Sequence, residues 1–209
     1  MKTLAKALCF TALAACSTSF ETDFAQPLSP DVTRHWNVVG VSVNVPDELT
    51  VSEENSFVPD ADIVWHGDPL GDRRAQVADI IREGVARGAS ELNGPRPVKL
   101  NLQVSKFHGV SPIAREKAPS AVHNITYFIQ ATDAQTGEVI SPPEQIKAAL
   151  QALTGFQAIE ATIQGQTQKV RITDHLEAVT EGWLGIGPDP RGTFEGLGRL
   201  LVQGLRSGT

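Results

Sequence analysis

Val98-Lys99-Leu100-Asn101-Leu102-Gln103-Val104-Ser105 carries the clearest secondary-structure pattern of the chain. Apolar side chains at every second position alternate with polar ones, which is the period of a β-strand with one buried face. Such a strand belongs to a sheet that turns one face to the core and the other to water. This stretch therefore predicts a sheet covered on one face.

A helix precedes this strand. Asp72 is a suitable N-cap, and Asn93-Gly94-Pro95 ends the helical pattern. One helical face is apolar and contains Val77, Ile80, Ile81, Val85, Ala89 and Leu92. Gly84 and Gly88 on the same helix should let it approach the sheet closely.

Three extended segments come before the helix. In 36–46, Val39, Val41, Val43 and Val45 alternate with smaller or polar residues, which predicts a half-buried strand ended by Pro46. Residues 49–51 and 61–65 are shorter candidates. A strand at 36–46, the helix and the strand at 98–105 would form a strand–helix–strand crossover.

The second half of the chain alternates again. We expect a loop over 109–121, a strand over 122–132, and a turn at 133–138 that makes a hairpin ended by Pro142-Pro143. Residues 144–164 are ambiguous and favour a helix interrupted at Gly155. A helix is expected over 166–184, and a short terminal helix over 194–205. The fold class expected is α+β, an antiparallel or mixed sheet with helices packed on one face.

The N-terminus has the features of a lipoprotein signal peptide. Lys2 and Lys6 precede the short apolar run of residues 7–13, and the small residues Ala14 and Ala15 lead directly into Cys16. A run of this length is too short to span a membrane. We therefore predict cleavage after residue 15 and acyl chains on Cys16, with a plain signal peptide as the alternative.

This prediction divides the chain into a signal peptide (1–15), a lipidated tether (16–35) and one periplasm-facing domain (36–209). Residues 16–35 contain few apolar side chains and two prolines, as flexible linkers do. Two or more acyl chains anchor a protein stably without a membrane span. Ser17, which is not aspartate, favours the outer membrane over the inner one by the sorting rule of enteric lipoproteins.

Composition excludes several classes of function. The chain has a net charge of −6, and loss of Lys2 and Lys6 leaves 16 basic against 24 acidic residues, a net charge of −8. Nucleic-acid binding needs a basic surface, so we expect none. The two cysteines are Cys9 and Cys16. One is removed and the other is lipidated, which leaves no disulfide and no thiol chemistry in the domain.

Catalytic and metal-binding motifs are missing from the sequence. None of the histidine pairs has the i, i+4 spacing of a helical zinc site, and no Gly-x-Ser-x-Gly motif occurs. His66 and Asp68 on one turn are the best candidates for a hydrolase or a metal-dependent enzyme, although a solvated turn explains them better. The acidic residues between Asp60 and Asp72 lack the spacing of a calcium loop. We expect no catalytic residues, no metal and no cofactor.

The most distinctive polar stretch is 164–176. It can be read as the solvated start of a helix, or as a recognition surface built from Gln166, Gln168, Lys169 and Arg171.

The chain also resembles a known family. The segment 60–65 with Gly67-Asp68, the turn 136–138 and the stretch 165–176 resemble DUF6778, a family of lipoproteins of alphaproteobacteria without an assigned activity. The resemblance covers most of the mature chain and implies no catalytic residues. More loosely, an anchor, a tether and a small α+β domain look like the auxiliary lipoproteins of envelope transport and assembly systems.

Together these features predict a membrane-anchored bacterial lipoprotein. We expect it to act as a non-enzymatic binding or assembly component of the cell envelope, with an envelope protein or another envelope component as its partner. The alternative is a periplasmic hydrolase or metal-dependent enzyme that uses His66 and Asp68.

Overall fold

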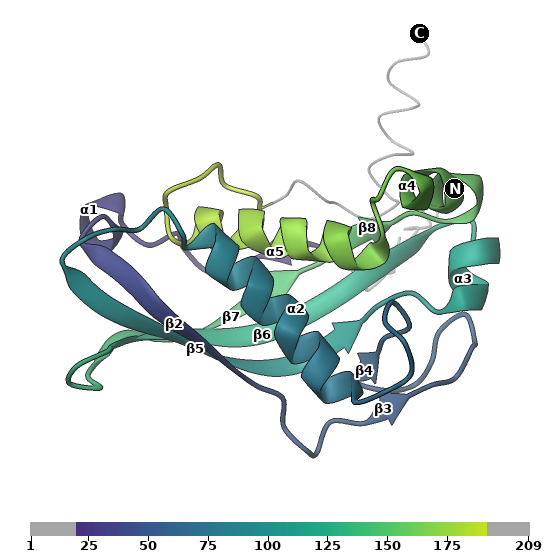
Figure 1. Ribbon diagram of the computed structural model, residues 1–209, viewed down its shortest axis with the longest axis horizontal. Helices are drawn as coiled ribbons and strands as arrows, with labels where there is room; N and C mark the ends of the chain where they lie inside the picture. The colour runs from purple at the N-terminus through teal and green to yellow at the C-terminus, as the bar shows by residue number, and fades with distance from the viewer. Residues whose placement is uncertain (1–19, 192–209) are drawn as a thin grey trace, which may run out of the picture.

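The predicted central strand is the middle of a mixed eight-stranded sheet in the computed structural model, which describes residues 20–191 (Figure 1). Strand β5 (Arg96–His108) pairs antiparallel with β6 (Ala121–Asp133) along most of its length. Its other edge is shared by β2 (Trp36–Asn44) and β4 (Ile63–Val64), both parallel to it. Strand β3 (Val51–Ser52) continues the sheet beyond β4. The parallel pairing of β2 with β5 around a helix confirms the expected crossover.

Strand β6 is flanked on its second edge by two strands. It pairs antiparallel with β7 (Val139–Ala148) and with β8 (Leu150–Ala152). The short β1 (Thr22–Asp23) lies antiparallel to the end of β7. The turn after β6 is the predicted one, because Asp133 accepts hydrogen bonds from the backbone of Gln135 and Thr136.

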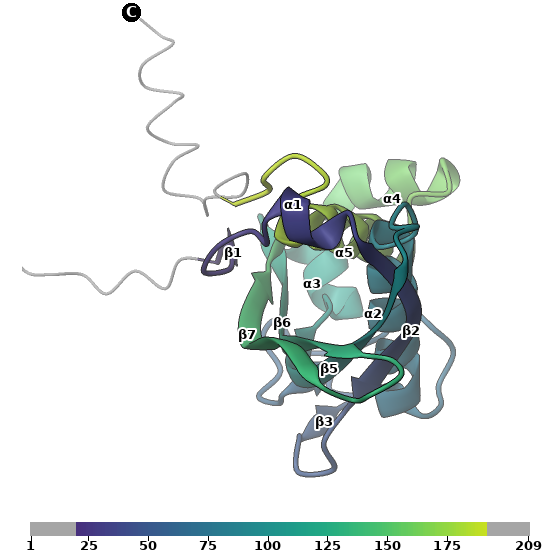
Figure 2. The ribbon, with the colours of Figure 1, turned by 90° about the vertical axis from the view of Figure 1, so that its left-hand side faces the viewer.

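Two long helices fill the concave side of the curved sheet (Figures 1 and 2). They are α2 (Arg73–Gly88), capped by Asp72 as predicted, and α5 (Gln168–Trp183), capped by Thr167. The apolar face predicted for α2 is buried in the core. The α+β class with helices on one face of a mixed sheet is therefore confirmed. None of the helices within residues 20–191 is long and apolar enough to cross a membrane.

The glycines of α2 have a different partner from the one expected. A Cβ atom at Gly84 would lie 2.6 Å from Leu176 Cβ, and one at Gly88 would lie 2.5 Å from the carbonyl oxygen of Glu177. Both neighbours belong to α5. The glycines thus allow close contact between two helices, and not between a helix and the sheet.

Strand β2 departs from its predicted alternation at one point. The register with β5 shifts between Val38 and Gly40, as in a β-bulge. Val38, Val41 and Val43 face the core, whereas Val39 is 54% exposed. An irregularity of one residue is enough to move a side chain to the other face of a strand.

Residues 20–35 belong to the folded domain, so the predicted flexible tether is wrong over this range. Phe24 is 3% exposed, and the backbone of Leu28 donates a hydrogen bond to Trp183 O at 2.7 Å. The short helix α1 (Pro30–Thr33) is fixed by Thr33, whose hydroxyl donates to Leu184 O at 2.9 Å. Residues 16–19, like the predicted signal peptide, lie outside the described range.

Three further expectations are corrected. Pro142-Pro143 does not end β7, because β1 pairs only with residues 147 and 148 of β7 and the prolines stand on an otherwise open edge. The predicted loop 109–121 contains helix α3 (Pro112–Lys117). Residues 144–152, where a helix was favoured, form the end of β7 and β8, and the helix α4 (Gly155–Ile163) begins only at Gly155, with a φ of +55°, where a break was expected. The terminal helix expected over 194–205 lies outside the described residues.

Candidate functional site

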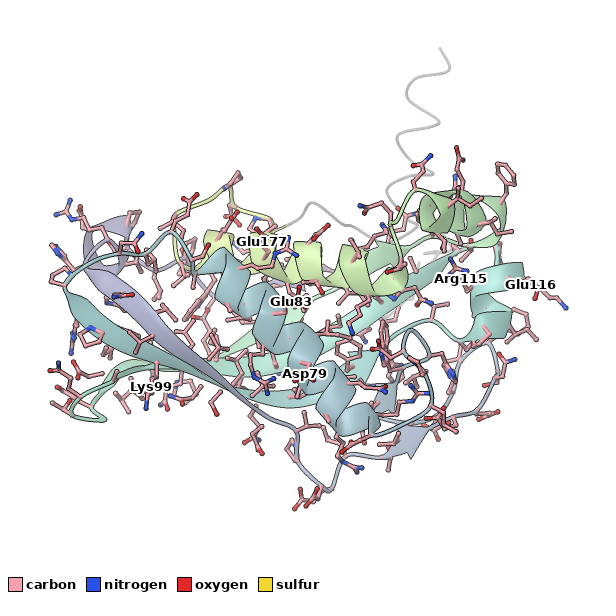
Figure 3. All side chains as sticks on the ribbon, in the orientation of Figure 1. Asp79, Glu83, Lys99, Arg115, Glu116 and Glu177 are labelled. Carbon is pink, nitrogen blue, oxygen red and sulfur yellow. The ribbon has the colours of Figure 1, made fainter. Side chains whose placement is uncertain are left out.

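A cleft of about 470 Å³ opens at one end of the domain. It lies where the loop after β4, helices α3 and α4, and the first turn of α5 meet. Its lining consists of His66, Gly67, Pro112, Arg115, Glu116, Gly155, Ile159, Thr162, Thr167 and Gln168. A volume of this size is within the range of small-molecule and peptide side-chain pockets. Figure 3 labels Arg115 and Glu116 at this end of the molecule.

Helix α3 forms one wall because of a local capping signal. The hydroxyl of Ser111 accepts a hydrogen bond from the backbone of Ala114 at 3.2 Å, and Pro112 occupies the first helical position. Ser111 also donates to Ser56 O at 2.6 Å. Asn55 accepts from the backbone of Ile113 at 2.8 Å. These contacts fix α3 on the loop between β3 and β4.

Arg115 joins the two walls of the cleft. Its Nη2 donates to Ala158 O at 2.7 Å and to the hydroxyl of Thr162, both on α4. Neither acceptor carries a charge. Within residues 20–191 no carboxylate lies within 4.0 Å of the guanidinium, although Glu116 is its neighbour in sequence. The cleft therefore contains a cation whose charge is not neutralised by a described ion pair.

The start of α5 contributes further hydrogen-bond donors. Thr167 caps the helix by accepting from the backbone of Val170 at 3.3 Å. The amide oxygen of Gln168 accepts from the backbone of Val110 at 3.2 Å, which leaves its amide N–H groups for other acceptors. The first backbone N–H groups of a helix also favour a negative group. Arg115 and the start of α5 thus both present hydrogen-bond donors to the cleft, whose lining also includes Glu116.

His66 lines the cleft with a largely buried imidazole. Burial lowers the pKa of its imidazole, and Glu53, whose carboxylate is 4.0 Å from Nδ1, opposes this only in part. Its Nε2 atom is buried and has no hydrogen-bond partner among the described residues. Because Nε2 is buried, it is not open to a ligand in the cleft, and His66 contributes to the wall through the rest of its ring.

The carboxylate of Asp68 is held by residues other than His66. One of its oxygens accepts from Trp65 Nε1 at 2.8 Å, and the other accepts from Lys169 Nζ at 2.9 Å. Burial by itself would raise the pKa of Asp68, but these two hydrogen bonds outweigh it and lower the pKa. Asp68 is thus an ionised anchor that fastens the loop after β4 to α5.

The acidic residues between 60 and 72 are likewise used locally. Asp62 accepts hydrogen bonds from both the backbone and the hydroxyl of Thr50, and Asp72 caps α2. Across residues 20–191 no group of three His, Cys, Asp or Glu side chains is placed to hold a metal ion.

The residues of the predicted recognition surface have different surroundings, and their role stays a prediction. Gln168 lines the cleft, Lys169 binds Asp68, and Arg171 donates to Gln151 O at 3.0 Å. Gln166 is exposed beyond the end of the helix. Most of the cleft is lined by residues that the sequence did not indicate, among them Arg115, Ile159, Thr162 and Thr167. The Ser111-Pro112 capping signal was the one local clue to the position of Arg115.

Helix α4 adds an apolar rim. Its large hydrophobic side chains Phe156, Ile159 and Ile163 are 78%, 55% and 82% exposed. They stand three and four residues apart, so they share one side of the helix. Ile159 also lines the cleft. The site thus combines donors for a negative group with an apolar surface at its edge.

Fold and site together define a small α+β domain with a ligand-sized cleft at one end of the sheet. The chain belongs to DUF6778, a family of unknown function whose model matches residues 36–199. This confirms the family resemblance seen in the sequence. None of the curated proteins matches the chain in sequence. Cys16 and its lipidation lie outside the described residues and stay a prediction, as does the alphaproteobacterial origin.

Solved structures show weak similarity to the fold. A DUF330 protein from Xanthomonas campestris is 14% identical, with a TM-score of 0.44; the match covers 87% of this chain and 94% of that one. A protein from Caulobacter crescentus, provisionally described as a lipoprotein, is 15% identical with a TM-score of 0.33, covering 52% and 83%. The PelC dodecamer from Paraburkholderia phytofirmans is 10% identical with a TM-score of 0.32, covering 75% and 96%.

Proposed function

We propose that this protein is a membrane-anchored lipoprotein that faces the periplasm and binds an envelope component without catalysing a reaction. The anchor in this proposal is the predicted lipid on Cys16, with the outer membrane favoured by Ser17. The binding site is the cleft between α3, α4 and the start of α5. The component bound there is a protein segment or another envelope molecule that presents a carboxylate or phosphate next to an apolar group.

The observation that carries this proposal is the position of Arg115 in the cleft. A guanidinium with neutral partners is attractive to an anion, because the ligand gains a charge-assisted hydrogen bond without first displacing a carboxylate. Thr167, Gln168 and the start of α5 add donors of the same polarity. The chain as a whole is acidic. A local cation in an acidic protein favours a bound anion over general attraction to anionic lipid.

A binding role agrees better with this geometry than hydrolysis does. A general base must lie within hydrogen-bond reach of the group that it deprotonates. Asp68 is held by Trp65 and Lys169, and His66 faces Glu53 at 4.0 Å. The enzyme alternative would need a catalytic group supplied by other residues.

The anchor is tested by labelling cells with an alkyne fatty acid and separating inner from outer membranes. We expect label on the wild-type chain in the outer-membrane fraction and none on Cys16→Ala. A mature N-terminal peptide with an unmodified thiol would refute the anchor.

The cleft is tested by photo-crosslinking in intact cells. A photoreactive amino acid at Ile159 should give a defined adduct, and the same amino acid at Val139, which is exposed on β7 beside the 133–138 turn at the other end of the sheet, should not. Arg115→Gln should abolish the adduct, because the charge is lost while an amide donor remains for Thr162. An adduct that is equally strong in Arg115→Gln would show that the cleft does not select an anionic group.

A further inference from the structure

Strand β2 borders the sheet with an unpaired backbone edge. It pairs with β5 on one side. On its other side, the backbone from Val38 to Asn44 has no hydrogen bond to a strand, helix or side chain within residues 20–191. Figure 2 shows β2 as the last strand on its side of the sheet. An edge of this kind presents a row of free N–H and C=O groups to any approaching strand.

This edge lacks the usual protection. The nine residues of β2, Trp36-Asn37-Val38-Val39-Gly40-Val41-Ser42-Val43-Asn44, contain no charged residue and no proline. Natural proteins prevent their edge strands from pairing with other chains by short strands, lysines, prolines or a covering segment. The bulge after Val38 is the one such device in β2, and it leaves the stretch from Gly40 to Asn44 regular.

The other borders of the sheet are protected. Strand β7 carries Pro142, Pro143, Glu144 and Lys147, and β1 covers its last residues. Strand β3 is only two residues long. The contrast shows that the open edge is specific to β2 and is not a general property of this sheet.

The inner side chains of β2 are also incompletely covered. Val41 and Val43 pack against the core but are only partly buried. Both belong to the strand whose outer backbone groups are free. A strand added here would gain backbone hydrogen bonds and would extend the core by covering these valines.

We propose that β2 pairs with β2 of a second copy of this chain, antiparallel and across a two-fold axis at Ser42, so that two sheets join into one. This register places Val41 opposite Val43 of the second copy on the inner face, and Ser42 opposite itself on the outer face. An uncharged strand meets no like charge when it pairs with itself, so a second copy fits this edge without a penalty. Opposed identical patches are the rule for two-fold dimers.

The register is tested by disulfide formation in membranes from cells that express the full chain. Ser42 is exposed, and directly opposed residues in an antiparallel pair have Cβ atoms roughly 4.5–5.5 Å apart. Ser42→Cys should therefore give a covalent dimer on mild oxidation. Gln103→Cys, equally exposed but on the inner strand β5, is the matched control and should stay monomeric.

The energetics are tested by a charge at the axis. Ser42→Lys would place two ammonium groups opposite each other across the axis. We therefore expect the molar mass of the detergent-solubilised protein, after the detergent mass is subtracted, to fall from that of a dimer to that of a monomer. Ser42→Thr should remain a dimer, and the Tm of the monomeric Ser42→Lys chain verifies its fold. A wild-type chain that is monomeric at every concentration, or a dimer that Ser42→Lys leaves intact, would overturn the proposal. So would equal cross-linking through Gln103→Cys.

Discussion

The contact between α2 and α5 allows a sharp prediction at Gly88. An added Cβ there would lie 2.5 Å from the carbonyl oxygen of Glu177 and 2.7 Å from Thr180 Cβ. Non-bonded heavy atoms prefer about 3.5–4.0 Å. One obstructing atom belongs to the backbone of α5, which has no rotamer to change. Gly88→Ala therefore forces the two helices apart by about 1 Å.

Two opposing effects set the size of the loss. In an exposed helix interior, replacing glycine by alanine stabilises by about 1 kcal/mol. Overpacking a buried contact costs about 1–3 kcal/mol. Because the obstruction is backbone, we take the upper end, which leaves a net loss of about 2 kcal/mol. For a domain of this size each kcal/mol lowers the Tm by roughly 2–4 °C, so the Tm should fall by about 4–8 °C.

The assay is thermal unfolding followed by circular dichroism on the purified chain. Ala86, exposed on the same helix, provides the control. Ala86→Gly measures the propensity difference alone and should cost about 1 kcal/mol. If Gly88→Ala unfolds at or above the wild-type Tm, the close approach of α2 to α5 through this glycine is refuted.

Three further predictions concern charges. The pKa of Asp133 is lowered to about 2 by hydrogen bonds from the backbone N–H of Thr136, the Arg96 guanidinium and the backbone N–H of Gln135. The stability that the ionised carboxylate gives the fold is therefore lost as the pH falls from about 4 to 2, and Asp133→Asn should lose less stability over that window in acid unfolding. Burial lowers the pKa of His123 to about 3, so the folded protein becomes less stable as the pH falls below about 6.5, where this histidine takes up a proton only in the unfolded chain. His123→Leu should reduce the loss in free energy of unfolding between pH 7 and 5 by about 2 kcal/mol, measured by urea titration at each pH. Asp68→Asn weakens the bonds from Trp65 and Lys169 and should lower the free energy of unfolding by about 1.5–3 kcal/mol, whereas Asp60→Asn should change it by less than about 0.5 kcal/mol.

Periodicity predicted the elements that are amphipathic over many residues. The apolar face of α2 from Val77 to Val85 and the alternation of β5 each repeat a pattern long enough to exclude the other period. The same reasoning failed where tertiary pairing decides. Pro142 is compatible with a strand because it stands on an open edge and at a shift in the register with β6, and no local signal gives either position.

The prediction of a flexible tether at the N-terminus was wrong over residues 20–35 for a related reason. The segment 20–35 is too polar to be recognised as structured by its own pattern. Its order depends on a few long-range contacts, such as Phe24 in the core and the bond from Leu28 to Trp183. A short strand that pairs over two residues with β7 leaves no period to detect.

The cleft was equally hidden, because four separate segments build it. His66 follows β4, Arg115 lies on α3, Thr162 lies on α4, and Gln168 opens α5. Local capping positions each helix, but only the packed sheet brings their ends together. Sequence spacing can reveal a site carried by one motif, and it cannot reveal one that is assembled from loop and helix ends.

The fixed N-terminal segment also constrains how the cleft could be used. If Cys16 carries acyl chains, only residues 17–21 separate the lipid from β1, which is held on β7 at Thr22. Five residues span at most about 17 Å. The domain would then lie close to the bilayer and would not be lifted away from it on a long tether. A partner of the cleft must in that case present its anionic group near the membrane surface, which favours an envelope-bound molecule over a freely diffusing one.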